Sequence, residues 1–277
     1  MIYLILSILS STLVSVFMRL GSRGESARKP MLAVNYLVCA AVSLAFLEGA
    51  PFTQAAGAGF ALALGLVGGG LFLGAFLLLQ ANVRENGVTL SSAFMKLGVL
   101  VPTVLGFTLF REALTWPRVL GIALTLAAIP LLNGQAEDGD QRRLILLVLL
   151  MLCGGMADGL SKFYEAYGNP DLKGQYLLYV FGFALLLCAG LCAIQRQKPA
   201  LRDWLFGALL GVPNYFSTRF LLLALADVPA SVAYPVFACG TILLTALIGR
   251  LAFAERPSRR QLVALMMVLV ALALLNV

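Results

Sequence analysis

The stretch REALTWPRVLGIALTLAAIPLLN, residues 111–133, has a counterpart 143 residues later in AERPSRRQLVALMMVLVALALLN, residues 254–276. Superposing the two stretches places Glu112 on Glu255 and Asn133 on Asn276. Each begins with a short charged segment and continues as an apolar run long enough for a helix. The match predicts that the chain contains a duplicated unit of helices.

The composition places these apolar runs in a membrane. Hydrophobic residues make up 61% of the chain and charged residues 12%, with a mean hydropathy of +0.94. A soluble domain carries about 25% charged residues, roughly twice this fraction. We therefore expect an integral, multi-pass protein of the plasma (inner) membrane, with the lipid bilayer as its surroundings.

The apolar residues form blocks that reach or nearly reach the length of a membrane-spanning helix. A helix needs about 20 apolar residues to cross the hydrocarbon core and satisfies its own backbone hydrogen bonds there. The blocks predict ten spans: 2–19, 30–48, 57–81, 88–110, 116–133, 143–163, 173–195, 203–226, 229–250 and 257–277.

The longest polar stretch, residues 133–143, lies near the middle of the chain and divides it into two halves. The offset found above also places Arg19 on Lys162 and Tyr36 on Tyr179. Five spans per half is an odd number, so the second half enters the membrane in the opposite sense. The predicted fold is an all-α membrane protein of ten transmembrane helices, arranged as two inverted five-helix repeats, residues 1–134 and 142–277.

Together with the duplication, three motifs carry a resemblance to a known family. They are the glycine-rich third span, Pro102 upstream of LFREAL, and the second-half echo LAFAERPSRRQ. The chain resembles the ten-helix drug/metabolite transporter superfamily, specifically its EamA-like branch. The resemblance implies transport of small organic solutes through a central cavity lined by helices one, three, four, six, eight and nine. One departure is Thr245, which stands where the first half has Pro102.

The loop charges and the resemblance disagree on orientation. Lys and Arg near helix ends are retained on the cytoplasmic side. One set of alternating loops holds most of them, and little beyond Arg111, Arg118 and Lys173 lies on the other side. This rule places both termini outside the cell, whereas the resemblance places both inside, and the sequence leaves both orientations open. The net charge of +7 suits a surface facing anionic lipid and gives no argument for nucleic acid.

The residue types needed for most catalytic and metal sites are missing or scattered. The chain has no histidine, so neither a Ser/His pair nor a histidine-based metal site can form. Cys188 and Cys192 share a helix face, but two thiols alone make a poor metal site. Gly65/Gly69 and Gly70/Gly74 are spaced for close helix packing. We expect no enzyme activity, no metal and no cofactor.

A few polar groups inside the spans remain as candidates for function. A charge at the bilayer centre costs at least about 2.5–3.5 kcal/mol, so it faces a cavity or a partner. Lys96 is the strongest candidate, since no charged residue lies one helical turn away. Structural alternatives stay open for the others: Asp158 can pair with Lys162, Arg219 can reach toward the interface, and Tyr234 can anchor a helix end.

The cavity implied by the resemblance gathers six candidate substrate-binding residues, and with two cations and one acid it is net positive. A carboxylate-bearing solute such as an amino acid is favoured, bound through its carboxylate by the two cations and through its ammonium by the acid. We expect an alternating-access exporter of a small zwitterionic or anionic metabolite, coupled to a proton or a counter-substrate. The alternative is a proton-coupled exporter of cationic drugs or toxic compounds. The six residues are Lys96, Asp158, Asn214, Tyr215, Arg219 and Tyr234.

Overall fold

A computed structural model gives the fold of the chain. It describes residues 2–21, 29–101, 115–133, 140–227, 230–254 and 258–274. Within these ranges the secondary structure is helical throughout, with turns and short connections between the helices.

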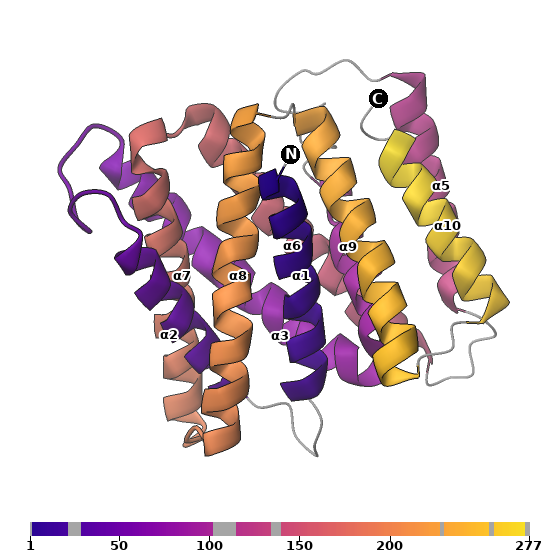
Figure 1. The fold of residues 1–277 in the computed structure, drawn as a ribbon, viewed down its shortest axis with the longest axis horizontal. Helices are drawn as coiled ribbons and strands as arrows, with labels where there is room; N and C mark the ends of the chain where they lie inside the picture. Colours follow the sequence, from indigo (N-terminus) through magenta and orange to yellow (C-terminus); the bar gives the residue numbers. More distant parts are fainter. Residues whose placement is uncertain are drawn as a thin grey trace.

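Long apolar helices account for most of the described residues (Figure 1). They are α1 (Ile2–Gly21), α2 (Lys29–Ala45), α3 (Ala58–Leu97), α5 (Trp116–Asn133), α6 (Asp140–Tyr167), α7 (Lys173–Ile194), α8 (Leu201–Asp227), α9 (Ala230–Phe253) and α10 (Arg259–Leu274), with a 3₁₀ turn, η1 (Pro170–Leu172), before α7. Apart from α3, the bounds of each helix lie within four residues of those of a predicted span.

Five segments of the described chain are long and apolar enough to cross a membrane. They are Ile2–Gly21, Ala58–Leu97, Arg143–Tyr167, Pro170–Ile194 and Val236–Phe253. The prediction of an all-helical, multi-pass membrane protein is confirmed at this level.

The third and fourth predicted spans differ from expectation because no loop separates them. They form one helical element, α3, interrupted by Gly87 alone, whose backbone has φ 79° and ψ 170°. Only glycine adopts this conformation readily, because it lacks a β-carbon. The chain therefore changes direction at a single residue, and Val88–Leu97 begins the fourth span. Residues 102–110 of that span lie outside the described residues.

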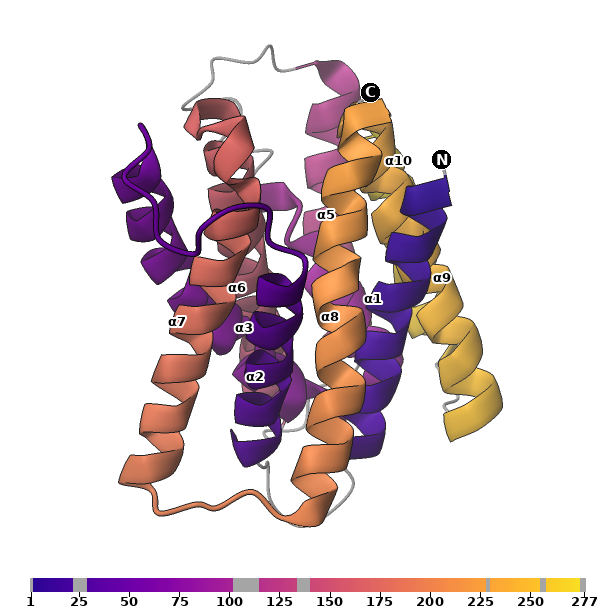
Figure 2. The same cartoon turned by 60° about the vertical axis from the view of Figure 1, so that its left-hand side comes forward.

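The helices pack in pairs that join the two halves of the chain. Helix α3 of the first half packs against α6 and α7 of the second. Helix α8 of the second half packs against α1 and α2 of the first. Figure 2 shows α8 beside both α1 and α2. The two last helices of the halves, α5 and α10, lie side by side at the edge of the bundle in Figure 1.

Pairs of glycines spaced four residues apart make two of these interfaces. A β-carbon on Gly65 would stand 2.5 Å from Cβ of Tyr179 on α7, and one on Gly69 would stand 2.8 Å from the Ala184 nitrogen. The predicted packing role of Gly65 and Gly69 is confirmed. On α8, Gly207 would meet the Met31 carbonyl oxygen on α2 at 2.6 Å in the same way. The second predicted pair, Gly70 and Gly74 of α3, packs less closely, since Gly70 has open space beside it.

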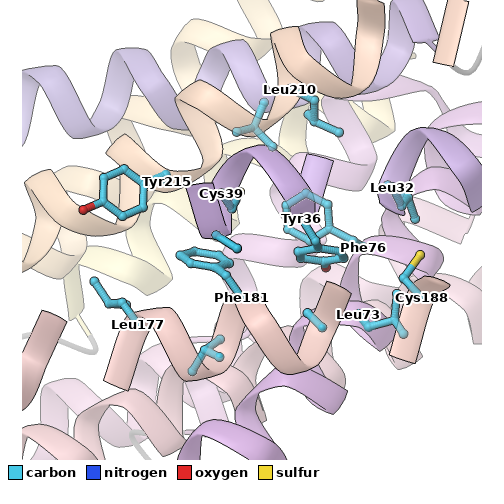
Figure 3. Packing of buried hydrophobic residues seen from close by; sticks show 14 of the residues in the cluster. Leu32, Tyr36, Cys39, Leu73, Phe76, Leu177, Phe181, Cys188, Leu210 and Tyr215 are labelled. Carbon is cyan, nitrogen blue, oxygen red and sulfur yellow. The ribbon is translucent and has the colours of Figure 1, made fainter. Parts of the chain in front are cut away.

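The largest apolar cluster lies among α2, α3, α7 and α8. Figure 3 shows Tyr36, Phe76, Phe181 and Tyr215 packed within it. The Tyr36 hydroxyl donates to the Phe72 carbonyl at 2.8 Å, so the phenol is buried with a partner. Two smaller clusters lie where α9 meets the rest of the bundle, and the candidate site lies between them.

Candidate functional site

Asp158 is exposed on the face of α6 that otherwise points into the bundle. Leu147 and Met151 share its side of the helix and are 5% and 7% exposed. The side that faces away from the bundle carries the exposed apolar residues Leu149, Leu152 and Met156. The described helices therefore leave the Asp158 side chain uncovered on the inward face of α6.

Lys96 lies on α3 and reaches toward α9. Its Nζ atom stands 3.8 Å from the centroid of the Phe237 ring, a cation–π contact between the first and second halves of the chain. The neighbours Phe94 and Leu97 are buried in one small cluster, with α6, α9 and α10. Phe237 belongs to the other, with Leu4. The lysine therefore bridges the two clusters.

The structure brings Lys96 and Asp158 together from α3 and α6. Their charges are close enough to attract each other. The Asp158 carboxylate also acts electrostatically on Tyr176 of α7. Tyr176 stacks on Tyr164, with ring centroids 4.0 Å apart, and its hydroxyl lies 3.4 Å from the Ser161 hydroxyl. The stacked rings of Tyr164 and Tyr176 thus lie beside Asp158.

A glycine crossing sets the separation of α3 and α6 beside this pair. A β-carbon on Gly155 would overlap the carbonyl oxygen of Gly98 and stand 2.6 Å from Cγ2 of Val101. The two backbones therefore approach without side chains between them, which glycine permits. Gly98 is two residues from Lys96, and Gly155 is three from Asp158. The crossing fixes how the two charges face each other.

Hydroxyl groups of α1 line the neighbouring seam. Ser92 of α3 donates to the Ser15 hydroxyl at 2.7 Å, and Ser7 donates to the Ser217 carbonyl of α8 at 2.9 Å. These bonds join α1 to α3 of the first half and to α8 of the second. Ser92, which lies one helical turn before Lys96, therefore faces the bundle.

Arg219 and Tyr215 form a separate group near the end of α2. The Arg219 guanidinium donates to the Tyr215 hydroxyl at 2.7 Å and to the Phe46 carbonyl at 3.3 Å, just beyond the last residue of α2. It also lies 4.8 Å from the centroid of the Phe46 ring. A cation at a helix C-terminus satisfies free carbonyls and favours the helix dipole. These contacts give the guanidinium a structural partner.

Asn214 lies one residue after Pro213, inside α8, and packs against α2. Its side-chain amide donates to the Asn35 Oδ1 atom at 3.3 Å and to the Cys39 sulfur at 3.5 Å. Asn35 is fully buried, and its own Nδ2 atom has no partner among the described atoms. The amide pair is a polar contact within an apolar interface.

Tyr234 lies in α9 by its backbone, but its side chain is outside what the structure describes. The structure adds three residues that the sequence analysis missed, Phe237, Tyr176 and Ser161. The described residues contain no group of three His, Cys, Asp or Glu side chains placed to hold a metal ion. What the site offers is one cation, one anion and aromatic surface.

Comparison with known proteins shows what this chain is similar to. The model of the EamA-like transporter family matches residues 142–277, the second predicted repeat. An uncharacterized protein of Haemophilus influenzae is 25% identical over 273 residues, covering 92% of this chain and 91% of its own. A solved crystal structure shares the fold, with a TM-score of 0.65 at 16% identity over 99% of this chain and 94% of its own. Over residues 142–277, its second half, this chain is thus similar to the EamA-like transporter family, a family of membrane transporters that is part of the drug/metabolite transporter superfamily.

Proposed function

We propose that the protein exports a small zwitterionic metabolite, such as an amino acid, across the plasma membrane by alternating access. The carrying observation is the pair of opposite charges inside the bundle, Lys96 on α3 and Asp158 on α6. The Asp158 side chain is exposed, and from this we infer a hollow between the helices at this depth. Placing an ammonium and a carboxylate within the membrane is expensive, and such groups mark substrate pathways.

The charge balance of the site favours a zwitterion over a simple anion. Arg219 is bound to the Phe46 carbonyl and the Tyr215 hydroxyl, so the pair at the hollow is one cation and one anion. A solute with a carboxylate and an ammonium complements both charges at once. In this proposal Lys96 and Asp158 are the substrate ligands. Asn214, Tyr215 and Arg219 shape the helices around them.

The pairing of helices supports the inverted repeat that alternating access requires. If the two halves correspond in order, α1, α2 and α3 match α6, α7 and α8. The contact of α3 with α7 then has its partner in α8 with α2, and that of α3 with α6 in α8 with α1. Exchanging the two halves thus turns each of these helix contacts into another contact that is present, as a two-fold relation requires. Alternating access would then be rocking of one half against the other.

A proton-coupled exporter of cationic compounds is the second candidate. The observation that favours it is the exposure of the Asp158 carboxylate, while the Lys96 ammonium is turned onto the Phe237 ring. In this case Asp158 would alternate between a proton and the cationic substrate.

Counterflow in proteoliposomes separates the two candidates. Vesicles loaded with unlabelled L-amino acids would be diluted into the labelled compounds, with ethidium as the cation in a parallel experiment. The proposal predicts amino acid exchange that is abolished in Lys96→Ala and Asp158→Asn and retained in Lys198→Ala, which removes an exposed loop lysine. Ethidium transport that depends on a pH gradient and survives Lys96→Ala would establish the second candidate instead.

A further inference from the structure

We propose that Phe237 determines substrate selectivity by holding the Lys96 ammonium in the empty carrier, so that only a solute with an anionic group can take the ammonium from the ring. The inference rests on the proposed function and deepens it. It names the residue that occupies the carboxylate subsite when no substrate is bound.

The geometry of the contact supports this role. The Lys96 Nζ atom lies 3.8 Å from the ring centroid, within the distance at which a cation is attracted to an aromatic face. Phe237 is 9% exposed and packs with Leu4 and Ala224, so neighbouring helices fix the ring. Apolar surroundings strengthen the attraction because less water competes for the ammonium.

A neutral ring is suited to hold the ammonium reversibly. Asp158 is the alternative partner on the facing helix, and a tight ion pair with it would leave both charges unavailable to a substrate. The ring keeps Lys96 charged and separate, and its attraction is weaker than that of a carboxylate with hydrogen bonds. An incoming carboxylate therefore displaces the ring, whereas a neutral amide or alcohol does not.

The contact also joins the two halves of the chain. Lys96 belongs to the first half and Phe237 to the second, and both lie at a place where α3 contacts α9. Displacement of the ring by substrate removes one attraction between the halves at the moment the site is filled. Selectivity and movement would then depend on the same contact.

Two variants separate the ring's role from its bulk. Phe237→Leu keeps an apolar side chain and removes the π face, and Phe237→Tyr keeps the face. In Phe237→Leu the ammonium has no competitor, so we expect a half-saturation concentration for L-amino acids about tenfold lower than in the parent. Phe237→Tyr should stay near the parent value. We also expect the leucine variant to exchange amino acid amides, which the parent rejects.

A second readout requires no substrate. Acetic anhydride would be applied to the protein in nanodiscs and the acetylation rate of Lys96 measured by mass spectrometry. The Asp158→Asn background removes the competing acid, so Asp158→Asn is compared with Asp158→Asn/Phe237→Leu. Release from the ring should raise the Lys96 rate severalfold while the rate at Lys198 stays constant.

Each result decides the inference. Faster acetylation together with tighter amino acid exchange supports it. Equal acetylation rates, or a raised half-saturation concentration in Phe237→Leu, would overturn it. If the parent exchanges no amino acid, the proposed function fails and the selectivity role fails with it, while the acetylation rates still report whether the ring holds the lysine.

Discussion

Replacing Gly155 by alanine tests whether α3 and α6 approach as closely as the site requires. The added methyl group would overlap the Gly98 carbonyl oxygen and stand 2.9 Å from the Gly98 carbonyl carbon. These are backbone atoms and cannot rotate away, so the helices must separate. The adjacent Gly154 offers a matched control, since its nearest neighbours are the Cγ and carbonyl oxygen of Met95, both at 3.7 Å.

The magnitude follows from the difference between the two variants. Alanine improves helix propensity over glycine by about 1 kcal/mol at either position, so this gain cancels in the comparison. Forcing a methyl group into a closely packed contact costs about 1–3 kcal/mol. We therefore expect Gly155→Ala to be less stable than Gly154→Ala by about 1–3 kcal/mol, which lowers the midpoint of thermal unfolding by about 2–10 °C.

The assay is thermal unfolding of purified protein in detergent, followed by the fraction that remains monodisperse after heating. Amino acid counterflow of the same variants gives the functional consequence. Separation of α3 from α6 moves Lys96 relative to Asp158, so Gly155→Ala should also lose exchange while Gly154→Ala keeps it. Equal midpoints for the two variants would refute the close crossing.

Two further variants test the contacts around the site. Arg219→Gln removes the bonds to the Phe46 carbonyl and to Tyr215 and should lower the free energy of unfolding by about 1–3 kcal/mol, measured by the same thermal assay. Loss of exchange in Arg219→Gln with an unchanged midpoint would instead make Arg219 a substrate ligand. Asn82→Ala removes the bond from its Nδ2 atom to the Leu146 carbonyl at 2.9 Å, which joins α3 to α6. A similar loss of about 1–3 kcal/mol is expected, and an unchanged midpoint would show that this bond does not stabilise the bundle.

The positions of the helices could be predicted from the sequence because the hydrocarbon core imposes their length and composition. The predicted span 116–133 coincides with α5, and 173–195 with α7 to within one residue. The break at Gly87 was not predicted as a single residue, because the polar run around it is equally typical of a short loop. Its positive φ angle is a property of the backbone that the residue type permits without specifying.

Some residues of the candidate site could be selected from the sequence. Lys96 could be chosen as a candidate because an isolated charge in an apolar span has few structural explanations, whereas for Asp158 a structural pairing with Lys162 stayed open. Phe237 could not be selected, since the sequence does not distinguish an aromatic residue that binds a cation from one that faces lipid. The contacts of Asn214 were also hidden, because its partner Asn35 lies 179 residues away in sequence. Long-range pairing decides such roles, and a single sequence does not contain it.

In the proposed function, Asp158 faces a water-filled hollow inside the membrane-spanning bundle. Asp158→Cys and Met156→Cys would be made in a background without the five native cysteines and placed in nanodiscs, which expose both sides of the membrane. Met156 is 51% exposed on the opposite face of α6, so it serves as a matched control that faces lipid. A charged, membrane-impermeant methanethiosulfonate reagent should modify the cysteine at position 158 and leave the one at position 156 unmodified. Modification at 156 but not at 158 would contradict the account.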